Sequence, residues 1–227
     1  MSFSSVDGIG ALRRERLRMA RLYFVCDARP GGEDPEPLLR AALDGGVDIV
    51  QLREKDGDLR TIERSAQTFR RICDTYGVPF MINDDPELAV SVRADGVHIG
   101  QDDVPVEEAR RIVGKDALIG LSTHSVEQIA AASGVDHISV GPVWETPTKA
   151  GRPAVGLELV EHAATHTTIP FFAIGGIDPD NVGEVLAAGA RRICVVRAIR
   201  DAADPAAVAA RLRRAFAAVG TEVAPGG

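Results

Sequence analysis

The chain alternates between two kinds of segment along nearly its whole length, and this alternation constrains the fold more than any other feature. Short apolar runs rich in valine, isoleucine and phenylalanine are typical of parallel strands buried on both faces. The predicted strands are 21–26, 47–52, 79–83, 95–99, 117–121, 136–141, 170–175 and 191–197. Between them, apolar residues recur three or four positions apart, which indicates helices with one buried face.

The predicted helices carry start and stop signals. They span 36–44, 58–76, 85–92, 104–113, 125–133, 156–166, 178–189 and 204–219. Asp178-Pro179 and Asp204-Pro205 each combine an N-cap residue with a proline suited to the first turn. Gly189 is expected to end its helix.

Alternating strands and helices predict an α/β protein, a single (β/α)8 TIM barrel over about residues 21–219 of the 227. An extra N-terminal helix is expected in the latter part of residues 1–20, and the tail 220–227 is expected to be frayed. A doubly wound sheet is the alternative. It usually needs a Gly-x-Gly-x-x-Gly loop after the first strand, and Gly8-Ile9-Gly10 precedes every predicted strand.

Composition limits the functional classes. The chain has 26 Lys and Arg against 33 Asp and Glu, a net charge of −7, which argues against broad nucleic-acid binding. Cys26, Cys73 and Cys194 form no Cys-x-x-Cys pair, which fits a reducing compartment, and Cys73 and Cys194 are expected to be core residues. No apolar run reaches about 18 residues, so no membrane span is expected. The N-terminus lacks a signal-peptide apolar region, and a cytoplasmic enzyme is the simple inference.

Polar segments follow several predicted strands, which is where an α/β barrel keeps its active site. They are 51–55 (QLREK), 83–85 (NDD), 141–149 (GPVWETPTK) and 175–177 (GGI). Together they offer basic residues, paired carboxylates, hydroxyls and a Gly-Gly turn. This combination predicts a phosphate-rich substrate bound with a divalent metal ion.

The first polar segment places three polar side chains on one side of a strand end. Gln51, Arg53 and Lys55 alternate in sequence, so all three are expected to face the barrel mouth. Arginine offers a planar fork for phosphate oxygens and lysine a movable point charge. A glutamine amide matches the edge of a heterocycle. A surface ion-pair cluster with Glu54 and Asp56 explains this segment equally well on its own.

Two acidic segments follow the third and fourth predicted strands. We predict that Asp84 and Asp103 share one Mg²⁺, which prefers oxygen ligands and retains water and substrate phosphates. Asp85-Pro86 is set aside because it has the pattern of a helix N-cap. Taken singly, each aspartate is better explained as a cap or turn residue.

The later segments supply hydroxyl and backbone donors. Ser122 is a candidate to hydrogen-bond a ring nitrogen or an amino group, and Thr146, Thr148 and Lys149 form a candidate phosphate clamp. Gly175-Gly176 precedes the helix expected at Asp178, where backbone N–H groups and the helix dipole favour an anion. The eighth strand ends at Val196-Arg197, a position where barrels of this type often bind phosphate.

Taken together, these segments resemble the thiamine phosphate synthase family over about residues 21–216. The motifs QLREK, ND, HIGQDD, the serine after the fifth strand, GPVWETPTK and AIGGI occur in the order of that family. The resemblance implies a transferase of thiamine biosynthesis. Such an enzyme joins 4-amino-2-methyl-5-(diphosphooxymethyl)pyrimidine to 4-methyl-5-(2-phosphoethyl)thiazole, or its carboxylated form, and releases pyrophosphate.

The resemblance also implies roles for individual residues. Mg²⁺ is the implied cofactor, bound by Asp84 and Asp103, and a homodimer is a family-level expectation. The implied catalytic residues are Arg53, Lys55, Ser122 and Lys149. The implied substrate-binding residues are Gln51, Leu52, Arg53, Glu54, Lys55, Asn83, Ser122, Thr146, Pro147, Thr148, Lys149, Gly175, Gly176, Val196 and Arg197.

One departure from the family and three rival functions remain. Arg197 stands where relatives often have a small serine, so its contact with the thiazole phosphate is open. A thiazole tautomerase would use His124 as acid and base, but would need no diphosphate or metal site. The other rivals are a different phosphate-binding barrel enzyme, such as a sugar-phosphate isomerase, and a non-catalytic thiamine-phosphate sensor.

Overall fold

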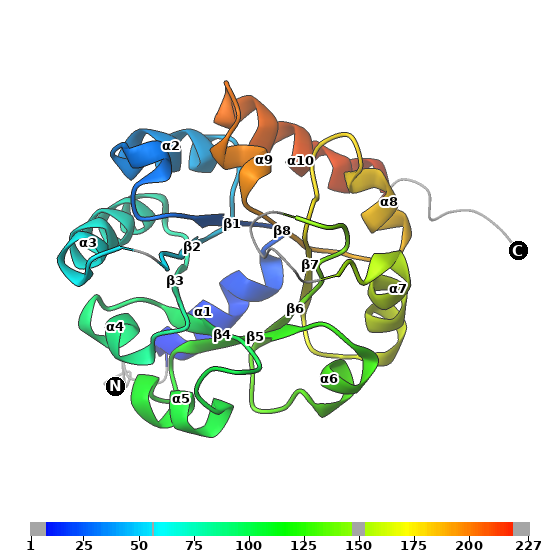
Figure 1. The fold of residues 1–227 in the computed structure, drawn as a ribbon, viewed down its shortest axis with the longest axis horizontal. Coiled ribbons are helices and arrows are strands. Elements are labelled where there is room, and N and C mark those ends of the chain that lie inside the picture. Colours follow the sequence, from blue (N-terminus) through cyan, green and yellow to red (C-terminus); the bar gives the residue numbers. More distant parts are fainter. Residues whose placement is uncertain (1–7, 56, 147–152, 220–227) are drawn as a thin grey trace, which may run out of the picture.

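The strands close into a barrel (Figure 1). The structure, a computed structural model, describes residues 8–55, 57–146 and 153–219. Its strands pair in parallel in chain order, and β1 also pairs with β8. They are β1 Leu22–Cys26, β2 Ile49–Leu52, β3 Phe80–Asn83, β4 Gly96–Ile99, β5 Leu118–Thr123, β6 His137–Val140, β7 Phe171–Ile174 and β8 Ile193–Val195. The predicted barrel is confirmed, and each strand lies within two residues of its predicted bounds.

Helices surround the barrel, except for α1, which lies across one of its ends (Figure 1). They are α1 Gly8–Met19, α2 Pro35–Asp44, α3 Leu59–Tyr76, α4 Pro86–Ser91, α5 Val106–Val113, α6 Val126–Ala131, α7 Gly156–His166, α8 Val182–Ala187, α9 Arg197–Arg200 and α10 Pro205–Val219. The extra N-terminal helix is confirmed. The sequence did not predict α9 or the short 3-10 helix η1 at Pro30–Gly32. The tail 220–227 lies outside the described residues.

The expected start of α8 at Asp178 is wrong, although the same dipeptide pattern correctly marks α10. Asp204 accepts a hydrogen bond from the Ala207 amide at 2.9 Å, and α10 begins at Pro205. Asp178 instead accepts from the amides of Asp180 and Asn181 at 2.8 and 3.1 Å, which closes a turn. The helix begins only after that turn, at Val182.

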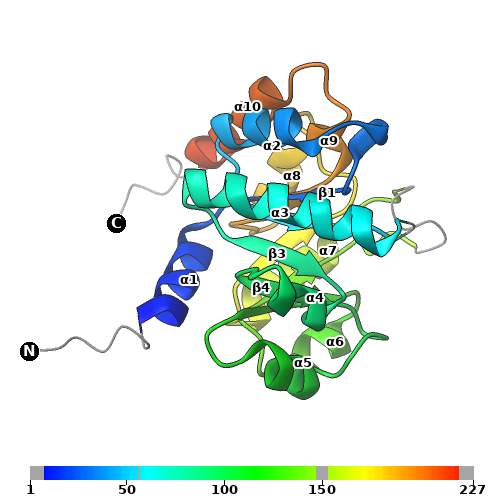
Figure 2. The same ribbon diagram turned by 90° about the vertical axis from the view of Figure 1, so that its left-hand side faces the viewer.

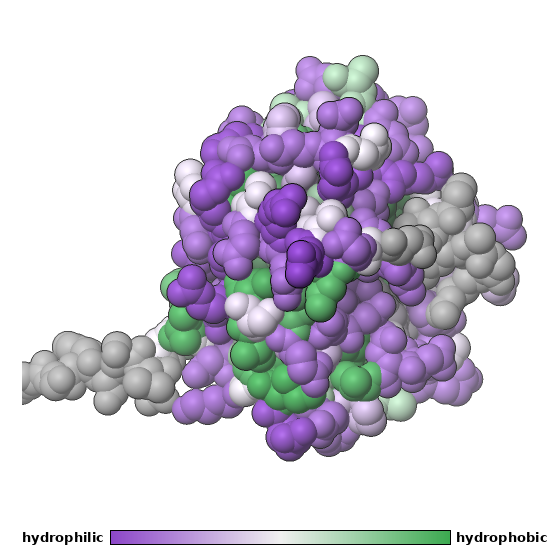
Figure 3. Space-filling model, turned by 60° about the vertical axis from the view of Figure 1, so that its left-hand side comes forward, coloured by the Kyte–Doolittle hydropathy of each residue, from purple (hydrophilic) through white to green (hydrophobic). Residues whose placement is uncertain are grey.

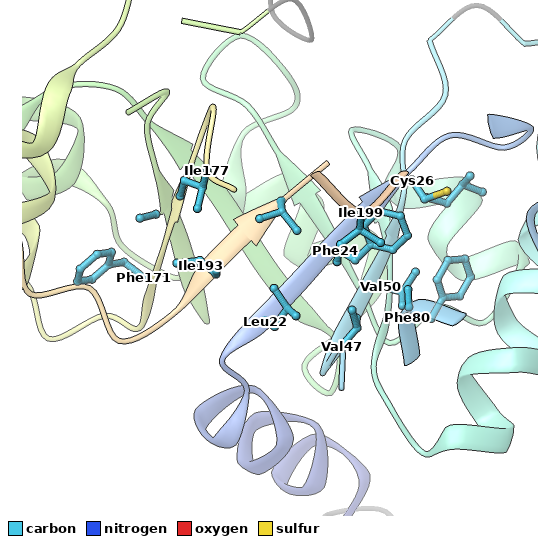
Figure 4. Close-up of a cluster of buried hydrophobic side chains, with 14 of the residues drawn as sticks. Leu22, Phe24, Cys26, Val47, Val50, Phe80, Phe171, Ile177, Ile193 and Ile199 are labelled. Carbon is cyan, nitrogen blue, oxygen red and sulfur yellow. The ribbon is translucent and has the colours of Figure 1, made fainter. Parts of the chain in front are cut away.

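Strand alternation divides the core into two layers. Leu22, Phe24, Val50 and Phe80 point outward from the barrel and pack beneath the helices (Figure 4). The residues between them, including Tyr23, point inward. Fully burying one such apolar side chain contributes about 1.5–3 kcal/mol, so both layers stabilise the barrel. Cys26, Cys73 and Cys194 are buried, which confirms the prediction for Cys73 and Cys194.

Helix α1 lies across the end of the barrel where the strands begin (Figure 2). Leu17, near its end, packs into the inner layer of the core. Arg13 pairs with Asp95 at 2.8 Å and Arg14 pairs with Asp136 at 2.7 Å. The helix therefore closes the barrel with both an apolar contact and ion pairs.

Three aspartates repeat one arrangement immediately before β2, β4 and β6. Each accepts a hydrogen bond from a backbone amide of the preceding strand and an ion pair from an arginine of a surrounding helix. The pairs are Asp48 with Leu22 N and Arg213, Asp95 with Phe80 N and Arg70, and Asp136 with Ile119 N and Arg110. Such a repeated cap on the strand starts indicates a role in stability rather than catalysis, because barrel chemistry is placed at the opposite end.

The outer surface is largely hydrophilic, with apolar side chains gathered in one area of the face in Figure 3. The large apolar residues exposed in the described chain are Ile9, Leu12, Met19, Leu59, Val90 and Val126. Within the same residues, no helix is long and apolar enough to cross a bilayer. The expected homodimer stays a prediction.

Candidate active site

A cavity of about 350 Å³ is formed by inward side chains of the strands and by the loops that follow them. Its lining includes Gln51, Arg53, Asn83, Ser122, Thr146, Gly175, Gly176, Val196 and Arg197. These residues come from the ends of β2, β3, β5, β6, β7 and β8 or from the loops that follow, which lie far apart in the sequence. The structure thus brings together most of the predicted substrate-binding residues.

The first polar segment divides as strand alternation predicts. Gln51 and Arg53 line the cavity, whereas Leu52 points away into the outer core layer and is 2% exposed. Arg53 is anchored by its backbone N–H, which donates to the Cys26 carbonyl at 2.9 Å. The buried amide nitrogen of Gln51 has no hydrogen-bond partner in the described protein. A buried amide that lines a cavity without a protein partner fits a ligand acceptor.

Lys55 and the two predicted metal ligands form a charged group next to this segment. Lys55 Nζ lies 3.9 Å from Asp84 Oδ2. Burial, and then hydrogen bonding and charge repulsion from Asp103, raise the pKa of Asp84 to about 6, although Lys55 opposes the change. Asp103 is held by the Gly100 amide, which donates to it at 2.6 Å. Lys55, Asp84 and Asp103 are therefore brought together.

The donor set fits a divalent cation. Two carboxylates in contact repel each other when ionised, and a cation between them removes that repulsion. Asp84 also adopts a left-handed conformation at φ 65°, which is strained for a residue with a side chain and often marks a functional site. No cluster of three or more His, Cys, Asp or Glu able to hold a metal exists among the described residues. Water and substrate oxygens would complete the coordination.

The Gly-Gly turn after β7 is required by its own geometry. Gly175 and Gly176 have φ values of 108° and 70°. A Cβ on Gly175 would lie 2.5 Å from the Pro142 Cα, and one on Gly176 would lie 2.8 Å from the Trp144 Cβ. The prediction that a helix dipole from Asp178 supports this turn is wrong, because α8 begins only at Val182. Backbone N–H groups of the turn remain the available anion donors.

Strand β8 ends at Val195, and Val196 and Arg197 lead directly into α9. Both residues line the cavity, together with Asp201 at the end of the same helix. The predicted contact of residue 197 with a phosphate stays a prediction.

Some predicted residues lie elsewhere. Glu54 is outside the cavity lining, and its carboxylate accepts from the Lys55 amide at 3.0 Å. Pro147, Thr148 and Lys149 lie outside the described residues. Asp85 caps α4 by accepting from the Leu88 amide at 2.8 Å, as its sequence pattern predicts.

Sequence reasoning missed a polar group deep in the barrel. His98, His137 and Ser139 line the cavity with Ser122, and all are less than 8% exposed. The available signal was strand alternation, because each of these residues occupies an inward position of β4, β5 or β6. Polar side chains at inward positions of three adjacent strands have to meet inside the barrel.

Burial of His137 leads us to predict that the free energy of unfolding falls in acid. Burial lowers its pKa from 6.5 to about 4, so the folded protein holds this ring neutral while the unfolded chain protonates it. Above pH 6.5 the free energy of unfolding is unaffected by this group. As pH falls from 6.5 toward 4, protonation of the unfolded chain lowers the free energy of unfolding by an amount on the order of 3 kcal/mol. Urea unfolding across this range should show a shallower pH dependence for His137→Gln. An unchanged slope would contradict the assignment.

His124 is in a different position from the buried histidines. Its Nδ1 hydrogen-bonds the Gly141 carbonyl, so Nδ1 carries the proton and Nε2 is the basic nitrogen. It lines the cavity at the end of β5. In this position, the His124 ring can contact a bound substrate.

The closed barrel, with a cavity lined by the carboxyl ends of its strands, has the architecture of a (β/α)8-barrel enzyme. A family model described as thiamine monophosphate synthase matches residues 22–199. The thiamine-phosphate synthase of Thermobifida fusca is 52% identical over 209 residues, which cover 90% of this chain and 96% of that protein. That of Thermus thermophilus is 51% identical over 200 residues, covering 86% and 96%. The chain belongs to the thiamine monophosphate synthase family.

Solved structures agree with this assignment. The thiamine phosphate pyrophosphorylase of Pyrococcus furiosus matches with a TM-score of 0.81 and 33% identity, covering 91% of this chain and 98% of that one. A 3-hexulose-6-phosphate synthase matches with a TM-score of 0.61 at 19% identity, covering 86% and 99%. The second likeness shows the barrel fold alone.

Proposed function

We propose that the chain is a thiamine-phosphate synthase. It transfers the aminopyrimidine methylene group from its diphosphate to the nitrogen of the thiazole phosphate and releases pyrophosphate. The main support for this proposal is that Gln51, Arg53 and Asn83 line one cavity together with the Gly-Gly turn. The charged group of Lys55, Asp84 and Asp103 adjoins this lining, because Asp84 directly follows Asn83 in the sequence. One part of this arrangement suits a diphosphate and the other a second phosphate.

The chemistry needs charge stabilisation more than proton transfer. Arg53 and Lys55 stabilise the negative charge that develops on the departing diphosphate. The electron-rich aminopyrimidine stabilises positive charge on its methylene carbon, so bond breaking can run ahead of attack. The thiazole nitrogen is a neutral nucleophile and requires no strong general base. The cavity accordingly supplies anion binders and orienting groups, and positioning contributes much of the remaining rate.

Asp84 and Asp103 would hold Mg²⁺, which supplies Lewis-acid neutralisation of the diphosphate charge. Lys55 Nζ lies 3.9 Å from Asp84 Oδ2, and this closeness to a proposed metal ligand supports a role for its ammonium group in binding the diphosphate. Thr146 lines the cavity and is the described member of the proposed phosphate clamp, which also includes Thr148 and Lys149.

The assay that tests the proposal mixes both phosphorylated substrates with and without Mg²⁺ and follows thiamine phosphate and pyrophosphate. We expect condensation only with Mg²⁺. No condensation, with isomerisation of a thiazole carboxylate phosphate instead, would favour the tautomerase in which His124 is the acid and base. Tight binding of thiamine phosphate without turnover would favour a sensor.

Arg53→Ala should lower kcat/KM for condensation by about 10²–10³-fold, because it removes a preorganised donor from the leaving group. Steady-state kinetics with a circular-dichroism check of folding measures this. Arg60→Ala is the matched control, because Arg60 lies exposed on α3. If the two variants were equally active, Arg53 would have no role in stabilising the leaving group.

Small phosphorylated heterocycles are the proposed partners. A cytoplasmic location, the homodimer and the absence of nucleic-acid or membrane partners stay predictions from the sequence.

A further inference from the structure

A hydrogen-bonded chain of buried side chains runs through the barrel interior to Ser122. His137 Nε2 lies 3.3 Å from His98 Nδ1, and His98 Nε2 lies 3.1 Å from Ser122 Oγ. Ser139 Oγ adds longer contacts of 3.4 Å to His98 Nε2 and 3.5 Å to Ser122 Oγ. The proposed function uses only the last member of this chain, Ser122.

Packing fixes the two imidazoles in this geometry. A Cβ on Gly120 would lie 2.3 Å from His98 Nδ1 and 2.4 Å from His137 Nε2, so only glycine leaves room for the pair. The rings of Tyr23 and Phe172 lie 5.9 and 5.5 Å from that of His137. The Gln101 amide also donates to the Ser122 carbonyl at 2.6 Å, which holds the strand end in place. The chain is therefore a rigid part of the barrel.

Two arrangements of protons satisfy the chain, and they give Ser122 opposite roles. In the first, His137 Nε2–H donates to His98 Nδ1, and His98 Nε2–H donates to Ser122 Oγ. Ser122 then keeps its own proton for a ligand. In the second, His98 Nδ1–H donates to His137 Nε2, and the Ser122 hydroxyl donates to His98 Nε2. Ser122 can then only accept from a ligand.

His137, at the end of the hydrogen-bonded chain away from Ser122, decides between the two proton arrangements. The pKa of His137 falls to about 4 because the ring is buried, so the ring is neutral near pH 7. Its Nδ1 is buried and has no hydrogen-bond partner in the described protein. The second arrangement leaves an N–H at that atom, and the first leaves only a lone pair. Orphaned buried N–H groups are rarer than under-satisfied acceptors, which favours the first arrangement.

We propose that His98 and His137 are positioning residues that hold Ser122 as a hydrogen-bond donor toward the cavity, and so select a heterocycle that presents an acceptor nitrogen there. The identity of that heterocycle rests on the proposed function. A 4-aminopyrimidine offers a ring nitrogen lone pair beside its amino group. Its 4-oxo counterpart has N–H at that ring position, and two donors would face each other. The chain thus makes the site discriminate between an amino and an oxo substituent.

The proton arrangement is tested on the free protein, independently of any activity. Long-range ¹H–¹⁵N spectra of histidine-labelled protein at pH 7 distinguish the two neutral tautomers, with His98→Gln and His137→Gln used to assign the signals. We expect both rings to carry the proton on Nε2. A proton on Nδ1 of His98 would overturn the proposal whatever the enzyme's reaction is.

Selectivity is tested by kcat/KM for the 4-amino and the 4-oxo pyrimidine diphosphates. His98→Leu should reduce the preference for the amino compound by at least about tenfold, since Ser122 regains both roles. His98→Gln retains an N–H donor near the position of Nε2 and should keep the preference within about threefold. His166→Gln, on the exposed end of α7, is the matched control.

The outcomes separate this proposal from the proposed function. An unchanged preference in His98→Leu, or an equal loss in His98→Gln, overturns the positioning role. Wild-type protein that condenses neither compound overturns the proposed function, and the tautomer spectra still decide the proton arrangement. If His98→Leu does not fold, the spectra and the selectivity of His98→Gln carry the test.

Discussion

Asp84→Asn combined with Asp103→Asn should reduce condensation by about 10³-fold or more, because a bound cation contributes several kcal/mol of charge stabilisation. The two amides keep the size of the carboxylates but lose the charge that attracts Mg²⁺. Activity should also stop responding to Mg²⁺ concentration. Steady-state kinetics across a magnesium titration measures both effects.

The same variant should be at least as stable as the wild type when Mg²⁺ is removed. The pKa of Asp84 is raised by burial and then by Asp103 to about 6. An acid with a raised folded-state pKa stabilises the fold below pH 3.8 and loses that contribution as pH rises through 6. At pH 7.5 the wild type therefore carries a repulsion that the variant lacks, which thermal unfolding in chelator detects.

Asp102→Asn is the matched control for both measurements, because Asp102 is an exposed neighbour on the same loop. It should retain activity and its response to Mg²⁺. If the double variant also retained magnesium-stimulated turnover, Asp84 and Asp103 would be cap and turn residues only, as each aspartate alone allows.

The barrel was predictable because continuous apolar runs for strands and a period of 3.6 for helices both report burial directly. Strand β2 shows why the site followed from it. Once Leu52 belongs to the outer layer, Gln51 and Arg53 must face inward, and both line the cavity. The start of α10 was equally readable, because Asp204 needs only the nearby Ala207 amide as its partner.

Two other features were not predictable from local sequence patterns. Asp178 has the same local pattern as Asp204, yet hydrogen bonds with Asp180 and Asn181 close a turn before the helix. The pairing of His98 with His137 depends on strand register across β4, β5 and β6, and on Gly120 leaving space between them. Local patterns identify which residues face inward, but register decides which of them touch.

Asp95 illustrates the same limit and yields the largest expected effect on stability. Its carboxylate accepts from Arg13 and Arg70 at 2.8 and 2.7 Å and from the Phe80 amide at 2.9 Å. Side-chain exposures of 17% for Arg13, 15% for Arg70 and 14% for Asp95 show that these charges are largely removed from water. Burial raises the pKa of Asp95, but the hydrogen bonds from Arg70, the Phe80 amide and Arg13, with the charge of Arg70, together outweigh burial and leave the pKa lowered.

Asp95→Ala should therefore lower the free energy of unfolding by about 3–5 kcal/mol, because it leaves two partly buried guanidinium groups and one strand amide without their partner. Asp74→Ala is the matched control. Asp74 pairs with the same Arg70 at 2.8 Å, but its side chain is 65% exposed. Its loss should cost less than about 1 kcal/mol. Urea unfolding at pH 7 compares the two. Equal losses would mean that closure of the barrel by α1 and the strand caps contributes little, and that apolar packing alone holds this end together.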